Sequence, residues 1–148
     1  MTSSDRAFPT RRRLLLIEDD AQSCAALCRW LSYEYDVTTA ADGLEGLEIA
    51  SRPPPPDVIV ADVWMPRLDG VSMVARLKQK ELLRRVPVIF LTGQTSPRSV
   101  AAGIAAGARA YLSKPVDLDL LDRKLRSALA ARGRPHGGDA SGGPGSLP

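Results

Sequence analysis

Residues 58–70 read Val58-Ile59-Val60-Ala61-Asp62-Val63-Trp64-Met65-Pro66-Arg67-Leu68-Asp69-Gly70, an apolar run that ends in a carboxylate. A carboxylate at the tip of a buried strand is costly unless another group compensates or uses its charge. Asp62 is therefore the first residue that a structure must explain. Asp69 and Gly70, which close the stretch, are predicted as turn and helix-start residues.

Three other apolar runs end in polar groups in the same way. Glu18 and Asp19 follow residues 14–17, Thr92 follows residues 88–91, and Lys114 follows residues 110–113. If these runs are parallel strands, their ends meet at one edge of a sheet, where open α/β sheets place their ligand sites. The sequence therefore predicts one site that combines Asp62 with these groups.

Strand-like and helix-like segments alternate five times along the chain. The expected strands are residues 14–17, 37–40, 58–62, 86–92 and 110–113, and the expected helices contain residues 24–31, 43–51, 70–77, 98–106 and 118–129. This alternation favours an α/β fold with parallel strands and helices on both faces. With right-handed crossovers, five strands fit the order 2-1-3-4-5 of a flavodoxin-like, doubly wound (βα)5 sheet.

Some local details can also be predicted. Asp20 and Asp117 are expected to cap the first and last helices. Gly107 is expected directly after the fourth helix, where a left-handed residue is common. In the second helix, Leu44 and Leu47 are expected to face inward.

Composition excludes several classes of protein. The chain has 148 residues, of which 44% are hydrophobic, and this is enough for one domain with its own core. The net charge of +3 indicates ordinary solubility, and the tract Arg11–Arg13 is too short to indicate nucleic-acid binding. We expect a cytoplasmic protein without membrane contact, because no run is long enough for a span and no signal peptide is visible. Cys24 and Cys28 are expected to be buried apolar thiols.

The chain divides into three parts by composition. Residues 1–10 are expected to be a flexible leader, residues 11–131 the folded domain, and residues 132–148 a disordered tail or interdomain linker rich in glycine and proline. His136, the only histidine, lies in this tail, so a catalytic role for it is not expected.

The predicted cluster suits phosphoryl transfer. Three carboxylates at one edge repel one another and need a cation, and oxygen ligands of this kind suit Mg2+ or Ca2+. A hydrated Mg2+ leaves room for a phosphate oxygen, while Lys114 and Thr92 supply a positive charge and a hydroxyl donor. In this hypothesis Asp62 is the nucleophile that forms an aspartyl phosphate, and Glu18 and Asp19 hold the metal.

From residue 12 to about residue 130, the sequence resembles a response-regulator receiver domain. The matching features are the acidic pair Glu18-Asp19, the segment from Asp62 through Met65-Pro66 to Asp69-Gly70, the strand-end hydroxyl of Thr92 and the aromatic Tyr111. The dipeptide Lys114-Pro115 also matches, and its peptide bond is typically cis in that family. All of these features occur in the family's order and at matching strand ends.

The resemblance implies a phosphorylation switch in a two-component system. A histidine kinase or phosphotransfer protein would phosphorylate Asp62, with Mg2+ bound by Glu18, Asp19, Asp62 and the backbone carbonyl of Trp64. Thr92 would then move toward the phosphate and Tyr111 would rotate inward. The face formed by residues 98–106, 110–113 and 118–129 would change for a downstream protein, an output domain or a phosphorylation-dependent homodimer. The resemblance implies no enzymatic activity beyond self-phosphorylation and slow autodephosphorylation.

Two residues depart from the family pattern. Gly93 follows Thr92 where the family usually has alanine, and it could loosen the loop that must move. Trp64 is large and lies two residues after the acceptor, so our hypothesis is that it slows the access of water to the phosphate.

Three alternatives stay open at this point. The chain could be the receiver part of a longer DNA-binding transcriptional regulator. It could be a phosphatase of the haloacid-dehalogenase type, although that class needs a second acid at the position held by Trp64. It could also be a binding module that is no longer phosphorylated, against which the complete set of acids, Thr92 and Lys114 argues.

Overall fold

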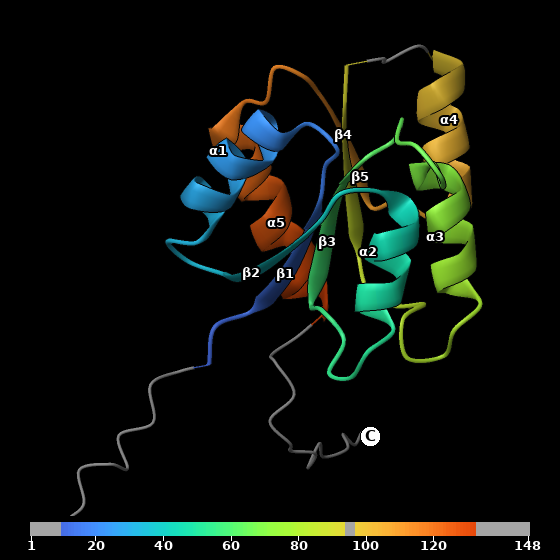
Figure 1. Cartoon of the computed structure of the whole chain (residues 1–148), viewed down its shortest axis with the longest axis horizontal. Helices are drawn as coiled ribbons and strands as arrows, with labels where there is room; N and C mark the ends of the chain where they lie inside the picture. Colours follow the sequence, from blue (N-terminus) through green and yellow to red (C-terminus); the bar gives the residue numbers. More distant parts are fainter. Residues whose placement is uncertain (1–9, 94–96, 133–148) are drawn as a thin grey trace, which may run out of the picture.

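The computed structural model describes residues 10–93 and 97–132, and within them five strands alternate with five helices (Figure 1). The strands are β1 (Arg13–Ile17), β2 (Asp36–Ala40), β3 (Val58–Asp62), β4 (Val88–Thr92) and β5 (Ala110–Ser113). The helices are α1 (Ala21–Leu31), α2 (Gly43–Ala50), α3 (Gly70–Lys78), α4 (Pro97–Ala106) and α5 (Leu118–Arg132). The predicted alternation is confirmed.

All strand pairs are parallel, and the sheet order is β2-β1-β3-β4-β5. This is the predicted doubly wound order. Ile17 lies opposite Ala61, Asp62 lies opposite Leu91, and Thr92 lies opposite Ser113. The register therefore brings the carboxyl ends of four neighbouring strands to the same edge of the sheet.

The sheet is covered on both faces, as its apolar strands require. Helices α1 and α5 lie on one face, and α2, α3 and α4 lie on the other (Figure 1). Alternate residues of β1, β3 and β4 enter opposite cores: in β1, Leu14 and Leu16 pack toward α1 and α5, whereas Leu15 and Ile17 pack toward the other three helices. These two cores hold the strand ends, and thus the site, in fixed positions.

Aspartate side chains cap the N-termini of four of the described helices. Asp20 and Asp69 accept hydrogen bonds from the backbone amides of residues 23 and 72, both at 2.8 Å, and Asp117 accepts one from residue 120 at 3.1 Å. Asp42 caps α2 in the same way, which we did not predict. Gly107 follows α4 with a φ of 116°, so it occupies the left-handed region as expected.

Several local predictions were wrong. β4 begins at Val88 rather than Val86, because the amide of Val86 bonds to Leu83 in a turn and Pro87 has no amide hydrogen to donate. Leu44 is exposed, whereas Leu47 packs against the core as expected. Cys24 and Cys28 are partly buried at the edge of the core rather than enclosed in it.

Residues 1–9 of the predicted leader (1–10) and residues 133–148 of the predicted tail (132–148), with His136, lie outside the described residues, so the domain boundaries stay predictions. Within the described part, α5 continues to Arg132. None of the helices in this part is both long and apolar enough to cross a membrane.

Candidate functional site

The carboxyl ends of β1, β3, β4 and β5 bring the predicted site residues together. Glu18 follows β1, Asp62 ends β3, Thr92 ends β4 and Lys114 follows β5. The amide of Lys114 donates a hydrogen bond of 2.9 Å to the Thr92 carbonyl, which continues the pairing of β4 and β5 into the site. Groups that are 96 residues apart in the sequence thus share one edge of the sheet.

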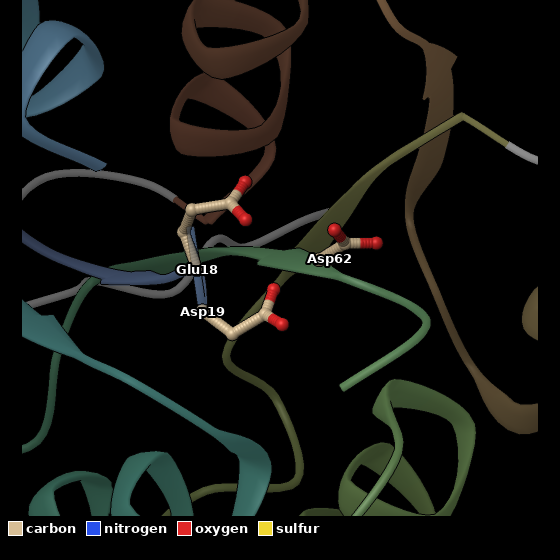
Figure 2. Close-up of side chains that lie close together, drawn as sticks. All are labelled: Glu18, Asp19 and Asp62. Atoms are coloured by element: carbon tan, nitrogen blue, oxygen red, sulfur yellow. The ribbon is translucent and has the colours of Figure 1, made fainter. Parts of the chain in front are cut away.

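Three carboxylates form the centre of this edge (Figure 2). One oxygen each of Glu18, Asp19 and Asp62 lies within 4.8 Å of the other two, which is close enough for a single cation to contact all three. The Glu18 side chain is only 3% exposed and that of Asp62 12%, whereas Asp19 is exposed. Hard oxygen ligands in this number fit Mg2+, which keeps several of its waters, so the residues present are suited to the predicted metal.

Lys114 already binds two of these carboxylates. Its Nζ donates to Glu18 Oε1 at 2.8 Å and to Asp62 Oδ2 at 3.0 Å. Burial alone would lower the pKa of Lys114, but the hydrogen bonds to Glu18 and Asp62 outweigh burial and raise it. The lysine is therefore charged at neutral pH, and one ammonium faces three carboxylates when all are ionised. The excess of negative charge favours a divalent cation.

The loop between β3 and α3 shapes the other side of the site. Asp62 Oδ1 accepts a hydrogen bond from the Trp64 amide at 3.2 Å, and the Gly70 amide donates to the Val63 carbonyl at 2.8 Å. Met65 is buried, whereas the Trp64 side chain is 52% exposed. The loop thus closes on itself beside the acceptor, while the indole stays accessible to solvent.

Thr92 and Tyr111 lie next to each other behind the acceptor. Thr92 is fully buried, and the Tyr111 ring packs edge-to-face on Phe90 with a centroid distance of 5.9 Å. Burial raises the pKa of the Tyr111 hydroxyl, the Asp62 carboxylate raises it further, and a hydrogen bond with Thr92 opposes both. The predicted switch residues are therefore within reach of each other and of the acceptor's charge.

An ion pair that we did not predict lies at the rim of the site. Arg67, in the same loop, donates to Asp42 Oδ2 from Nε at 2.8 Å and to Oδ1 from Nη2 at 3.2 Å. The only sequence signal was the spacing of Asp42 and Glu45, which is typical of a helix capping box. Nothing in the linear sequence pairs that cap with a residue 25 positions away.

A family model for the response regulator receiver domain matches residues 14–126, which is most of the chain and includes every predicted site residue. The chain belongs to the response regulator receiver domain family. The match favours the interpretation of the site as that of a receiver domain over the phosphatase alternative. The Lys114–Pro115 peptide bond is cis, as the resemblance implied.

Curated relatives and solved structures agree with the family. Transcriptional regulatory protein PrrA of Mycobacterium tuberculosis is 40% identical over 125 residues, which are 84% of this chain and 52% of PrrA. Response regulator MprA of Mycobacterium leprae is 40% identical over 118 residues, which are 79% of this chain and 50% of MprA. The structure of the chemotaxis response regulator CheY4 of Vibrio cholerae has a TM-score of 0.74 and 31% identity, and the match covers 81% of this chain and 100% of CheY4.

The receiver domain spans about half the length of the curated relatives that it matches. Receiver domains of response regulators are signalling proteins, and the family implies interaction with a histidine kinase and a downstream output. The acidic group of Glu18, Asp19 and Asp62 is a site that could hold a metal.

Proposed function

We propose that this receiver domain is a phosphorylation switch in which Asp62 accepts a phosphoryl group from a histidine kinase or phosphotransfer protein. The observation that supports this most directly is the bridge of Lys114 between Glu18 and Asp62, beside a third carboxylate. A partly buried ammonium that neutralises only part of an acidic group leaves that group in need of a metal. A purely structural ion pair needs no third acid at its edge.

The protein residues would divide the work of the transfer. An Asp62 carboxylate oxygen attacks phosphorus, a P–O bond forms, the P–N bond of the phosphohistidine breaks, and the imidazole nitrogen takes up a proton. Lys114 would exchange its bond to Asp62 for a phosphoryl oxygen, because a flexible ammonium with three donors can change partner. Glu18, Asp19, Asp62 and the Trp64 carbonyl would hold Mg2+, which supplies positive charge against the developing phosphoryl charge.

The added charge would then change a protein-binding face. Thr92 is at the end of β4, where its hydroxyl would turn toward a phosphoryl oxygen, and Tyr111 in β5 would follow because the two side chains are hydrogen-bonded. Ile104 in α4 and Leu118 in α5 are exposed apolar side chains that a protein partner on these elements would cover. The partner would be a downstream protein, an output domain or a second copy of the chain.

Intact-mass spectrometry after incubation with acetyl phosphate and Mg2+ tests the chemistry. We expect one phosphoryl adduct on the wild type, and none on Asp62→Asn or without the metal. Absence of an adduct under conditions that label another receiver domain would contradict the proposal, and would instead favour the binding module that is no longer phosphorylated.

The alternative of a DNA-binding output is supported by relatives that are named transcriptional regulatory proteins and of which the matched segment is only about half, 52% and 56% in two cases. In that case residues 132–148 would be an interdomain linker and residues 1–10 a leader. Purifying the protein from its native cells and measuring its mass would distinguish a separate receiver protein from the receiver part of a longer regulator.

A further inference from the structure

Arg67 has an unusual backbone conformation for a residue with a side chain. Its φ is 70°, and the Leu68 amide donates to the Pro66 carbonyl at 2.7 Å, so Arg67 is the central residue of a γ-turn. This form of the turn, with a positive φ, is rare and strained, and side chains other than glycine disfavour it. Such conformations persist where surrounding contacts hold them, and they are concentrated at functional sites.

The contact that holds this turn is the ion pair with Asp42. The two parallel hydrogen bonds join both guanidinium donors to both carboxylate oxygens, an arrangement that fixes orientation as well as distance. Asp42 is itself fixed, because its side chain is only 12% exposed and also accepts the Glu45 amide at 2.8 Å to cap α2. The Glu45 carboxylate in turn accepts the amide of Ala41.

The two segments that this ion pair joins, residues 40–43 and the β3–α3 loop, also lie next to the metal-binding residues. The carbonyl of Ala40, two residues before Asp42, accepts the Glu18 amide at 3.0 Å. The first residue of α2, Gly43, lies so close to the Leu68 carbonyl that even a methyl group would overlap it. The segment 40–43 therefore joins the end of β1 to the loop that contains the Trp64 carbonyl.

We propose that Arg67 is a positioning residue: through Asp42 it holds the β3–α3 loop in the geometry that Mg2+ binding requires. The inference rests on the proposed function, since it assigns the Trp64 carbonyl and Asp62 to the metal. Arg67 does not touch the metal, and it acts by setting where these two ligands lie.

The sign of one substitution separates this role from a simple charge effect. Removing a positive charge from the protein would by itself strengthen, not weaken, the binding of a cation. If Arg67 positions the loop, Arg67→Gln must instead weaken Mg2+ binding, and loss of such an outer-shell partner typically costs about 10-fold or more in metal affinity. If Arg67 only stabilises the fold, Arg67→Gln lowers the melting temperature, but a variant that is still folded binds Mg2+ as tightly as the wild type.

We suggest titrating the folded chain with Mg2+ and following Trp64 fluorescence, in a Trp30→Phe background that leaves one indole. Calorimetric titration with Mg2+ gives an independent value of Kd. The matched control is Arg52→Gln, because Arg52 has the same charge but pairs with Glu48 on the exposed side of α2. We expect Kd to rise about 10-fold for Arg67→Gln and to stay at the wild-type value for the control.

A second variant separates the ion pair from the strained turn. Arg67→Gly accepts a φ of 70° without strain but lacks the guanidinium, so it too is expected to bind Mg2+ more weakly. Asp42→Asn keeps a cap acceptor and loses the charge, and combining it with Arg67→Gln is expected to weaken binding no further than the more damaging single change.

The outcomes distinguish the two proposals. If the wild type binds Mg2+ and either Arg67 variant binds it equally or more tightly, the positioning role is wrong and the proposed function stands. If the wild type does not bind Mg2+, the proposed function fails and the positioning role fails with it.

Discussion

Gly70, the first residue of α3, allows the helix to approach the acceptor strand closely. A Cβ at this position would lie 2.7 Å from the Asp62 carbonyl oxygen, 2.8 Å from Cε1 of Phe90 and 3.0 Å from the Cα of Val63. The first two distances are shorter than real Cβ atoms show and the third is tighter than most real contacts, and two of the three atoms belong to the backbone at the end of β3. Phe90 is completely buried and cannot turn aside. Gly70→Ala must therefore move α3 away from β3.

The expected loss of stability is the balance of two effects. Overpacking of a well-filled core costs about 1–3 kcal/mol, whereas alanine in place of glycine in a helix gains about 0.5–1 kcal/mol. We therefore expect Gly70→Ala to lower the free energy of unfolding by about 1–2 kcal/mol, and the melting temperature by about 4–8 °C for a domain of this size. Since the overlap includes the Asp62 carbonyl, phosphorylation by acetyl phosphate should slow as well.

Thermal unfolding followed by circular dichroism provides the assay, with Gly93→Ala as the matched control. Among the residues that the structure describes, no atom lies within 4 Å of a Cβ on Gly93, and the φ of Gly93 is not in the left-handed region. The same chemical change should therefore raise stability at this position by about 0.4–1 kcal/mol, through the unfolded chain alone. Equal melting temperatures for the two variants, or a more stable Gly70→Ala, would refute the packing argument.

Three other substitutions test the site. Trp64→Asn should shorten the lifetime of the aspartyl phosphate if the indole slows the access of water, and equal lifetimes would disprove that hypothesis. Lys114→Gln should lower stability by about 1–3 kcal/mol in metal-free buffer, because two buried carboxylates lose their cation, and excess Mg2+ should restore part of it; a loss that Mg2+ does not reduce would argue against a shared site. The Arg67 hydrogen bonds lower the pKa of Asp42, so the pair stabilises the fold above about pH 4 and this contribution disappears as pH falls through the lowered value. Urea unfolding should thus show a stability difference between wild type and Asp42→Asn that is constant around neutral pH and shrinks in acid, whereas a difference that grows in acid would contradict the pKa direction.

The fold could be predicted because the signals for it are local and repeated. Each strand is a short apolar run, each crossover contains helical spacing, and the handedness of crossovers leaves few orders for the sheet. The predictions of burial failed where the exposure of a side chain depends on which other elements pack against it, and not on the type of the residue. Leu44 fits an apolar helix position, yet α2 covers the sheet near its edge and leaves that side chain exposed.

The convergence of the site could be predicted for the same reason, since parallel strands end at one edge. The pairing within the site could not. Nothing in the sequence says that Lys114 contacts Glu18 as well as Asp62, or that Asp42 receives Arg67, because such contacts depend on side-chain directions across several elements. No role was predicted for Arg67, and its positive φ of 70° is a feature of the three-dimensional structure.

The two cationic side chains discussed above, Arg67 and Lys114, differ in how easily their contacts can change. Arg67 makes two parallel bonds to Asp42, and a planar guanidinium held in this way loses both when it moves. Lys114 makes single bonds to Glu18 and Asp62, and its ammonium can give up one acceptor for another at little geometric cost. A switch needs both properties: the ligand loop must stay in place while the charge balance around the acceptor changes. On this argument the arginine belongs on the loop that must not move, and the lysine belongs where the phosphoryl group is to arrive.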